Sequence, residues 1–364
     1  MSTPLEQIIR DKIEAEGPIP LDEYMSLCLG HPEHGYYMTR DPFGKQGDFT
    51  TAPEISQMFG ELIGAWIVDS WEKMGCPSPL ILLECGPGRG TLMQDALRVT
   101  KAETRFHEAL ELHFLETSPI LKEKQKQALE GFGATWHTDL DSLPNHAPVI
   151  LIGNEFLDAL SVTQLVKTDT GWDEKYVEID KNGSFRIFVK TAENGKIDLI
   201  PPLLIQPKIE EQVEVSLEQK ELIEKLINII KKQSGICLFI DYGFTHNVAG
   251  ETLQAIKNHA YCNIFDNPGE ADLTAHVNFS NIAHLAMAQN ITVHGTVSQA
   301  DFLKRLGIEV RADQLRQNAT AQQEADIQAA LDRLIGTGNK RDEMGELFKV
   351  IAFSSDPTIQ LAGF

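Results

Sequence analysis

Apolar residues recur along this chain with two different spacings, and the spacing changes near residue 80. Before that point they return every three or four positions, which predicts amphipathic helices over residues 4–16 and 53–74. The segment between these helices is rich in glycine, proline and aromatic residues, so we expect a long loop there. Loops of this length inside compact domains are uncommon unless they cover a site or serve another function.

From residue 80 onward, short apolar runs alternate with helical patterns. This alternation predicts a parallel sheet with helices on both faces, and hence the α/β fold class. The runs that predict strands are 80–84, 112–116, 134–136, 148–152, 235–243 and 347–353. The predicted helices are 90–99, 118–130, 217–232, 298–306 and 321–335.

One segment interrupts this alternation. It contains predicted strands over 172–177 and 184–190, with turn signals at Asn182-Gly183 and Asn194-Gly195. The chain therefore divides into three predicted parts. These are an N-terminal helical cap with a covering loop (1–75), an α/β core with helical insertions (76–160 and 216–364) and a β-rich insertion (161–215).

The composition narrows the range of functions. The 364 residues carry a net charge of −21, and such a field repels nucleic acid phosphates and attracts basic partners. The five cysteines are scattered and form no CxxC pair, which argues against a disulfide framework or a zinc cage. The N-terminus has the character of neither a signal nor a transit peptide, and no apolar run reaches membrane-spanning length. We therefore expect a cytoplasmic protein without nucleic acid binding or membrane insertion.

The stretch "LECGPGRG", residues 83–90, is the most informative motif. It joins a predicted strand to a predicted helix, which is how an open α/β sheet builds a cofactor site. Glycines let backbone N–H groups approach a ligand, and a helix N-terminus favours a negative group. A dinucleotide fingerprint would place its third glycine at position 91, which is threonine. The loop instead resembles the acidic GxGxG loop of class I S-adenosylmethionine-dependent methyltransferases, with Glu84, Gly86, Pro87, Gly88 and Gly90.

Two further acids follow where such folds hold an adenosine group. Glu116 ends the second predicted strand, where a carboxylate accepts hydrogen bonds from ribose hydroxyls in methyltransferases and NAD enzymes alike. Asp139 follows the third strand, where methyltransferases often place an acid or amide against the adenine amino group. The structural alternatives are solvated strand-end acids for Glu84 and Glu116, and a helix cap or turn residue for Asp139.

The loop after the fourth predicted strand, "GNEFLDAL", is where a methyltransferase presents its acceptor-binding residues. Asn154 is followed by Glu155 and Phe156, not by the prolines of base methyltransferases, which disfavours base methylation. Glu155 and Asp158 offer two carboxylates, and Asp241 offers a third after the next strand. Carboxylates suit a guanidinium acceptor, because they orient its planar fork. The alternative is that Glu155 and Asp158 cap a helix that begins after the strand.

Other candidate motifs have less support. His31 and His34 have a spacing that could hold a metal, but no third ligand is evident, so no metal site is predicted. The chain has no GxSxG elbow, Walker loop or HExxH helix, which disfavours hydrolase and NTPase functions. His276 is either an acid/base group or a hydrogen-bonded structural histidine.

Seven ordered blocks of the chain together resemble the MidA-like family of class I methyltransferases. The similarity covers about residues 5 to 353, and the family includes a mitochondrial enzyme that methylates an arginine of a complex I subunit. One departure is Ser161, where the family pattern leads us to expect proline. The blocks are "HGYYMTR", "GDFTTAPEISQMFGELIGAW", "LLECGPGRGTLMQDALR", "NEFLDAL", "IDYG", "ADLTAHVNF" and "MGELFKV".

The resemblance implies a Rossmann-like methyltransferase fold that binds S-adenosyl-L-methionine. It also implies that the N-terminal helices and the "GDFTTAPEIS" loop close over the cofactor, with Asp48, Thr50, Thr51 and Ser56 lining the pocket. The alternative for Asp48 and Ser56 is a role as turn and cap residues. The predicted cofactor-binding residues are Thr51, Glu84, Gly86, Pro87, Gly88, Gly90, Glu116, Asp139 and Asn154. The predicted catalytic residues are Glu155, Asp158, Asp241 and His276.

These observations lead to one hypothesis and two alternatives. The hypothesis is a protein methyltransferase that modifies an arginine side chain of a partner protein, which the resemblance suggests is a respiratory NADH dehydrogenase subunit. The first alternative is a non-catalytic assembly or binding factor that retains the cofactor fold. The second is an NAD oxidoreductase, which would bind nicotinamide in place of S-adenosylmethionine.

Overall fold

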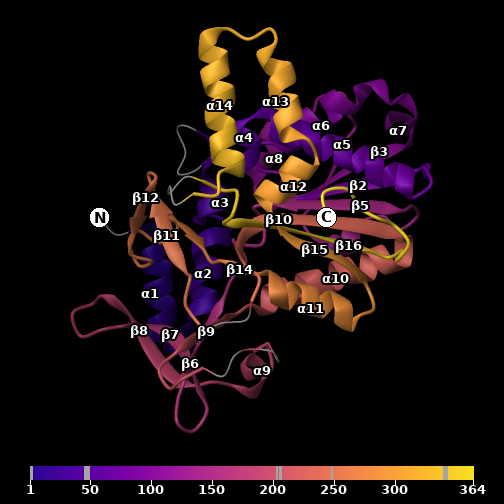
Figure 1. Ribbon diagram of the computed structural model, residues 1–364. Coiled ribbons are helices and arrows are strands. Elements are labelled where there is room, and N and C mark those ends of the chain that lie inside the picture. Colours follow the sequence, from indigo (N-terminus) through magenta and orange to yellow (C-terminus); the bar gives the residue numbers. More distant parts are fainter. Residues whose placement is uncertain (1–2, 45–49, 202–203, 205–206, 247–248, 339–342) are drawn as a thin grey trace. The chain divides into compact units, whose positions relative to one another are not determined.

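The computed structural model describes residues 3–44, 50–201, 204, 207–246, 249–338 and 343–364 (Figure 1). Contacts divide the chain into two compact units. Unit 1 comprises Met1–Phe49, Leu157–Leu222 and His246–Asn281, and unit 2 comprises Thr50–Phe156, Ile223–Thr245 and Ile282–Phe364. These units place the N-terminal and inserted segments in one body, whereas the three-part division based on the sequence stays a prediction. Asp48 lies outside the described residues.

Unit 2 is built on a mixed sheet whose strand order is β15-β16-β10-β5-β2-β3-β4. The α/β fold is confirmed, but the sheet is not parallel throughout, because β16 runs antiparallel to both β10 and β15. A strand buried on both faces has the same apolar pattern in either direction, so the sequence could not reveal this. The strands are β2 (Leu80–Cys85), β3 (Leu110–Leu115), β4 (Thr135–His137), β5 (Val149–Asn154), β10 (Gly235–Phe244), β15 (Thr292–Ser298) and β16 (Phe348–Ser354).

Helices cover this sheet on both faces. The apolar sides of α5 (Gln57–Lys73) and α6 (Thr91–Val99) form one core with side chains of the central strands. In Figure 1, α10 (Leu217–Gln233) lies on the other side of the sheet from α5 and α6. The two helices on the first face pack closely, since a Cβ atom added at Gly64 would lie 2.7 Å from Ala96 Cα. The remaining helices of this region are α7 (Thr104–Ala109), α8 (Pro119–Ala128), α11 (Phe279–Ala288), α12 (Gln299–Arg305), α13 (Ile308–Arg316) and α14 (Ala321–Ile335).

The predicted helix over 53–74 is divided in two. The short helix α4 spans Ala52–Ile55, and α5 begins after Ser56. Ser56 is extended, and its hydroxyl accepts a hydrogen bond from the Met58 N–H, which is the geometry of an N-cap. Apolar periodicity continues across this break, because α4 and α5 both contribute to the same core.

Unit 1 is mainly β structure with two N-terminal helices, α1 (Pro4–Glu16) and α2 (Leu21–Gly30). One sheet has the order β1-β7-β6-β9, with β8 paired to β7, and a second sheet has the order β12-β11-β13. The strands predicted near 172–177 and 184–190 are confirmed as β7 and β8, which form an antiparallel hairpin. The bounds are β1 (Ile19–Pro20), β6 (Thr163–Lys167), β7 (Trp172–Ile179), β8 (Phe185–Thr191), β9 (Gln212–Val215), β11 (Gln254–Lys257), β12 (Ala260–Cys262), β13 (Asp272–Thr274), β14 (Val277–Asn278) and α3 (Tyr36–Thr39).

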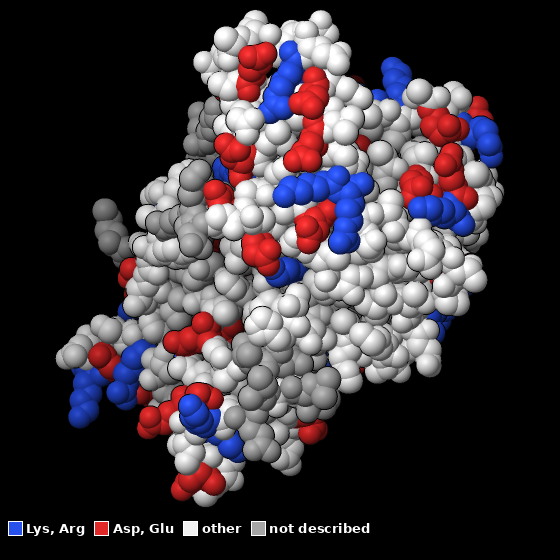
Figure 2. Space-filling view, in the orientation of Figure 1, with Lys and Arg blue, Asp and Glu red and all other residues white. Residues whose placement is uncertain are grey.

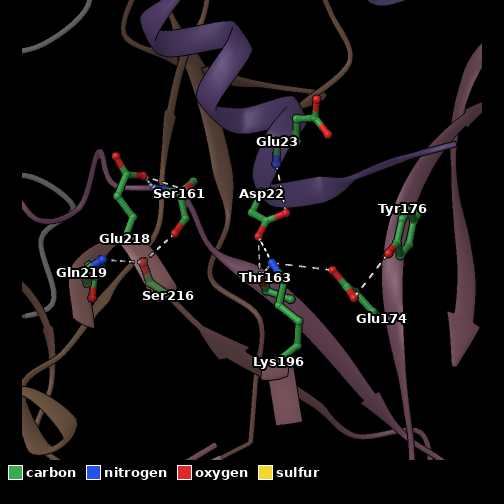
Figure 3. Close-up of polar contacts among 10 residues, drawn as sticks. All are labelled: Asp22, Glu23, Ser161, Thr163, Glu174, Tyr176, Lys196, Ser216, Glu218 and Gln219. Atoms are coloured by element: carbon green, nitrogen blue, oxygen red, sulfur yellow. Dashed lines mark hydrogen bonds and ion pairs between the residues drawn. The ribbon is translucent and has the colours of Figure 1, made fainter. Parts of the chain in front are cut away.

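The second predicted turn, at Asn194-Gly195, is instead the short helix α9 (Asn194–Ile197). A partly buried polar cluster holds this helix (Figure 3). Lys196 forms an ion pair with Asp22 at the start of α2, and its Nζ donates to Thr163 Oγ1 at 2.9 Å. Glu174 on β7 is buried, with its Oε1 3.8 Å from the same ammonium. Because this cluster joins α2, β6, β7 and α9, tertiary contacts override the local turn signal.

Ser161 shows how the chain accommodates its departure from the family pattern. Its backbone N–H and its hydroxyl both donate to Glu218 Oε2, at 2.9 and 2.8 Å (Figure 3). Its carbonyl oxygen accepts from Ser216 Oγ at 2.6 Å. Proline has no N–H, so it could make neither of the two bonds to Glu218. The serine therefore ties the chain after the acidic loop to the start of α10.

In unit 2, the helices α13 and α14 form an antiparallel hairpin that is anchored by a buried carboxylate. Glu61 on α5 is 2 % exposed, and Arg311 on α13 binds both of its oxygens at 2.7 and 3.1 Å. Arg98 on α6 adds a third contact at 2.9 Å. Farther along the hairpin, acidic and basic side chains lie next to one another at the surface (Figure 2).

Within the described part of the chain, no helix combines the length and apolar character needed to cross a bilayer.

Replacing Arg311 with lysine should destabilise unit 2. Lysine presents one ammonium group and cannot occupy both oxygens of the buried Glu61 in parallel. We expect the free energy of unfolding to fall by about 1–2 kcal/mol, measured as a lower midpoint in calorimetry. Arg316→Lys on the same helix is the matched control, because Arg316 pairs with the exposed Asp313, and such a pair contributes about 0–1 kcal/mol. Equal midpoints for the two variants would contradict an anchoring role for Arg311.

Candidate cofactor and acceptor site

The glycine loop after β2 has a backbone that other residues would strain. Gly86, Gly88 and Gly90 all have positive φ angles, of 63°, 54° and 83°. The Gly86 N–H donates to the Leu115 carbonyl at the end of β3, at 3.1 Å. A Cβ atom at Gly86 would also lie 2.7 Å from Phe156 Cδ2, so the loop is closely packed on this side. The carbonyl of Pro87 accepts from the Gly90 N–H at 2.7 Å, which closes the turn into α6.

Thr91, at the position where a dinucleotide fingerprint has glycine, has a structural role. Its hydroxyl donates to Glu54 Oε1 at 2.5 Å. The other oxygen of Glu54 lies 3.5 Å from Arg89 Nη1. Glu54 belongs to α4, so the short helix is fastened to both the glycine loop and the first residue of α6. The sequence analysis did not identify Glu54 as a site residue.

Two buried acceptors lie at the carboxyl ends of the neighbouring strands β2 and β5. Glu84 is 2 % exposed and Asn154 is 8 % exposed. Among the described residues, neither Glu84 Oε2 nor Asn154 Oδ1 has a hydrogen-bond partner. Burial, and secondarily the charge of Glu116, raises the pKa of Glu84 to about 8. Uncompensated buried polar groups are costly, so this pair indicates a place for a ligand that carries donors.

Glu116 lies at the end of β3 and is also buried. Its carboxylate accepts hydrogen bonds from the Ser118 N–H at 2.7 Å and from Gln125 Nε2 at 2.8 Å. Burial raises the pKa of Glu116, and these hydrogen bonds oppose that rise. Asp139 is exposed and accepts from the Ser142 N–H at 3.0 Å as the N-cap of a short 3-10 helix, Leu140–Ser142. Asp139 therefore makes the helix-capping contact that was the structural alternative for this residue. Hydrogen bonding of Asp139 to the adenine amino group stays a prediction.

The turn after β5 presents Glu155 in an unusual conformation. Glu155 has a φ of 48°, in the left-handed region that non-glycine residues rarely adopt. Two contacts with β10 hold it there, since the Glu155 N–H donates to the Ile240 carbonyl at 2.8 Å and the Phe156 N–H donates to Asp241 Oδ2 at 3.1 Å. Asp241 is buried and also accepts from the Tyr242 N–H at 2.9 Å. Strained residues that are held this firmly concentrate at functional sites.

The capping alternative for the acidic loop is wrong in its original form. No helix follows β5 among the described residues 155–162, where the chain makes turns and then enters β6. Glu155 instead caps a helix far away in the sequence, because its Oε1 accepts from the Ala52 N–H of α4 at 2.7 Å. The same oxygen accepts from Asn154 Nδ2 at 3.2 Å.

The residues of the covering segment have structural contacts in unit 2. Thr51 is the N-cap residue of α4, where its side chain makes no capping hydrogen bond. The carbonyl of Thr50 accepts from Arg333 Nη2 of α14 at 3.1 Å. Together with Glu155, these contacts hold α4 from both sides.

Asp158 and His276 belong to unit 1. The Asp158 carbonyl accepts from the Ala275 N–H at 3.0 Å, and its buried carboxylate contributes, after burial and Asp272, to raising the pKa of Tyr37. The His276 N–H donates to Thr252 Oγ1 at 2.8 Å, and burial lowers the pKa of the imidazole. The four predicted catalytic residues are thus divided between the units, with Glu155 and Asp241 in unit 2.

The donors of S-adenosylmethionine fit the two unpartnered acceptors. Its methionine end has an ammonium group, which is a donor for a carboxylate and an amide oxygen such as those of Glu84 and Asn154. When bound, the cofactor supplies a methyl group on a sulfonium sulfur.

No group of three or more metal-ligating side chains occurs in the described parts of the chain. The rings of His31 and His34 stack on one another at 5.4 Å.

Comparison with solved structures agrees with this assignment. A protein of Burkholderia thailandensis, crystallised with S-adenosyl-homocysteine, has a TM-score of 0.83 and 27% sequence identity to this chain. The similarity covers 99% of this chain and 93% of that one. A native crystal structure of a protein from the same organism gives a TM-score of 0.82 and 28% identity, over 99% of this chain and 94% of that one.

Curated relatives of this chain are also named as methyltransferases. The protein arginine methyltransferase NDUFAF7 homologue of Drosophila melanogaster is 36% identical over 96% of this chain and 84% of its own length. The human NDUFAF7 protein is 34% identical over 85% of this chain and 74% of its own length. Both relatives are named as mitochondrial, so the cytoplasmic location expected from the N-terminal sequence is contradicted.

A family model identifies the chain independently. The model, named Methyltransf_28, describes S-adenosyl-L-methionine-dependent methyltransferases and matches residues 62–297. This range contains the glycine loop, Glu116 and the acidic turn after β5. Since the nicotinamide and non-catalytic alternatives have no comparable support, S-adenosyl-L-methionine is the cofactor and the protein is an enzyme. The chain belongs to this family of S-adenosyl-L-methionine-dependent methyltransferases.

Proposed function

We propose that this methyltransferase modifies an arginine side chain of a partner protein. The observation that carries the proposal is the acidic turn at the end of β5, where Asp241 and β10 hold Glu155 in a strained conformation beside Asn154. The names of the relatives, which are protein arginine methyltransferases, support it. The net charge of −21 also favours a basic target.

The chemistry of arginine explains why a carboxylate is needed. A guanidinium group stays protonated at neutral pH and its lone pair is delocalised, so it is a weak nucleophile. A carboxylate that binds two of its N–H groups fixes the plane of the fork and raises the electron density of the reacting nitrogen. The reacting nitrogen would take the methyl group that the sulfonium supplies and would lose one proton to water, with S-adenosyl-homocysteine as the leaving group. Position and orientation account for most of the acceleration, because the leaving group is already good.

Each site residue then has a proposed role. Glu84 and Asn154 bind the ammonium group of the cofactor, the loop of Gly86, Pro87, Gly88 and Gly90 passes under its methionine end, Glu116 accepts from the ribose hydroxyls and Asp139 accepts from the adenine amino group. Glu155 orients the guanidinium, and Asp241 positions Glu155 through the Phe156 N–H. Thr51 stays a proposed pocket residue, and the catalytic roles of Asp158 and His276, which belong to unit 1, stay predictions from the sequence.

The target that we propose is a subunit of a respiratory NADH dehydrogenase. The resemblance to the MidA-like family suggests this partner. Mass spectrometry of arginine-containing peptides from cells with and without the protein tests it, with methylarginine on such a subunit as the expected difference. Unchanged methylation of every NADH dehydrogenase subunit would overturn the choice of target.

Cofactor binding should release a proton below pH 8. Burial raises the pKa of Glu84 to about 8, so this carboxyl is protonated at pH 6.5 in the free protein. An ammonium group at hydrogen-bond distance favours the ionised form, and the pKa must fall on binding. Calorimetry with S-adenosyl-homocysteine in buffers of different ionisation enthalpy should detect this release, and it should disappear well above pH 8.

Two results would decide the role of Glu84. The Glu84→Gln variant has no proton to lose, so its binding enthalpy should lose the buffer dependence that this carboxyl causes. If wild type and variant release protons equally, Glu84 does not meet the ammonium group.

Neutralising Glu155 should separate methyl transfer from cofactor binding. In Glu155→Gln the amide oxygen can still accept from the Ala52 N–H, so α4 keeps its cap, but the charge that holds a guanidinium is gone. We expect transfer of labelled methyl groups to arginine to fall at least about tenfold, the effect of losing one charged hydrogen bond. Affinity for S-adenosyl-homocysteine should stay within about twofold.

The matched control is Glu324→Gln on α14, because Glu324 is an exposed glutamate of the same unit. This variant should retain full transfer. Label on lysine or histidine in place of arginine, or full arginine labelling by Glu155→Gln, would contradict the proposed acceptor.

A further inference from the structure

Gln125 joins three parts of the cofactor end of unit 2. It lies on α8, where the surrounding positions are mostly lysine and glutamate, yet its own side chain is completely buried. Its Nε2 donates to the Gly88 carbonyl at 2.7 Å and to Glu116 Oε2 at 2.8 Å. Its Oε1 accepts from Trp136 Nε1 at 2.8 Å. One amide therefore links the glycine loop, the acid at the end of β3 and strand β4.

These three bonds require an amide in one orientation. A primary amide has two N–H donors and one carbonyl acceptor, and here each donor and the acceptor has a partner. The indole N–H can only donate, so Trp136 fixes the carbonyl end and directs the NH₂ group toward Gly88 and Glu116. A glutamate at position 125 would place a second carboxylate against Glu116, and an apolar residue would remove a hydrogen-bond partner from three groups, including the buried Glu116 carboxylate.

The side-chain amide of Gln125 contacts two elements that are proposed to bind the cofactor. Gly88 lies at the centre of the loop that passes the cofactor, and Glu116 is the proposed partner of the ribose hydroxyls. Gln125 contacts both elements, but the glycine loop is also closed by the bond from the Gly90 N–H to the Pro87 carbonyl, so loss of the amide should shift Glu116 more than Gly88. Glu116 is also held by backbone hydrogen bonds, among them that from the Ser118 N–H at 2.7 Å.

We propose that Gln125 is a positioning residue that acts through Glu116 to determine affinity for the ribose of the cofactor. It does not touch the cofactor itself in this assignment. The inference rests on the proposed ribose-binding role of Glu116, and it does not depend on the identity of the methyl acceptor.

The test compares two ligands in two variants. Gln125→Met keeps the length of the side chain without its hydrogen bonds, and Gln127→Met is the control, because Gln127 is an exposed glutamine on the same helix. Calorimetry measures the affinity for S-adenosyl-homocysteine and for an analogue that lacks both ribose hydroxyls. Gln125→Met should weaken binding of S-adenosyl-homocysteine about tenfold and leave binding of the analogue nearly unchanged. Gln127→Met should match the wild type for both ligands.

Two further measurements distinguish a positioning role of Gln125 from a general loss of structure. The KM for S-adenosylmethionine should rise in Gln125→Met, while kcat at saturating cofactor stays close to that of the wild type. The loss of affinity as pH is lowered should begin at higher pH in the variant, because Glu116 loses a hydrogen bond that opposes the rise of its pKa. For the analogue that lacks both ribose hydroxyls, the pH at which affinity begins to fall should be the same in the variant and the wild type.

Trp136→Phe provides a second variant if Gln125→Met fails to fold. It keeps Gln125 and removes only the donor that orients the amide, so the same ligand-dependent loss is expected, by about threefold. Equal loss of affinity for both ligands, or none, would overturn the proposal. Failure of the wild-type protein to methylate arginine, with the ligand difference intact, would overturn the proposed acceptor and leave this inference standing.

Discussion

A buried carboxylate with an unpartnered oxygen, Glu84 at the end of β2, is the constraint around which this site is organised. Protein interiors seldom leave such a group uncompensated, because its desolvation costs several kcal/mol of stability. Here burial keeps it protonated near neutral pH, and the amide oxygen of Asn154 at the end of β5 is unpartnered as well. Parallel strands bring these two ends together, so the fold concentrates unmet acceptors where a ligand can supply donors. In the proposed assignment of Glu84 and Asn154 to the ammonium group, part of the affinity for the cofactor comes from relieving the instability of this pair in the free protein.

The short helix α4 gives the cofactor loop and the acceptor turn a common support. Glu54 binds Thr91 at the start of α6, while the first N–H of α4 is capped by Glu155 after β5. Because α4 has only four residues, movement of the start of α6 therefore strains the turn after β5, and movement of the turn strains α6. A residue in the left-handed region costs about 1 kcal/mol or more, so Glu155 keeps its conformation only because α4 and β10 both hold it. In the proposed assignment, α4 therefore couples the cofactor side of the site to the acceptor side within unit 2.

The positions of the candidate site residues at strand ends were predictable from the sequence, and contacts between distant segments were not. The glycine loop, Glu84 and Glu116 follow from strand-end positions that a short motif encodes. Gln125 had no signal, because its helix has a polar composition and only the folded chain shows that this one polar side chain faces inward. The cap that Glu155 gives to α4 spans 103 positions, so a pattern that suggested a nearby helix led to the wrong partner. The antiparallel β16 was missed for a similar reason, since burial determines apolar pattern but not strand direction.

The contact between Glu155 and α4 bears on how an acidic turn can serve an arginine. Glu155 Oε1 accepts from the Ala52 N–H and from Asn154, so a guanidinium fork would share this oxygen or displace those donors. Carboxylate oxygens have two lone pairs each, and bidentate binding of a guanidinium uses one on each oxygen. Sharing is excluded, because the Ala52 and Asn154 donors already use both lone pairs of Oε1. Displacing the longer of these bonds, from Asn154 Nδ2, would leave the α4 cap intact and would make acceptor binding sensitive to the helix that also holds Thr91. A lysine ammonium, as a single rotating donor group, would gain less from a carboxylate that is fixed in plane by its own cap. The rigidity of the turn therefore favours a planar acceptor over a flexible one.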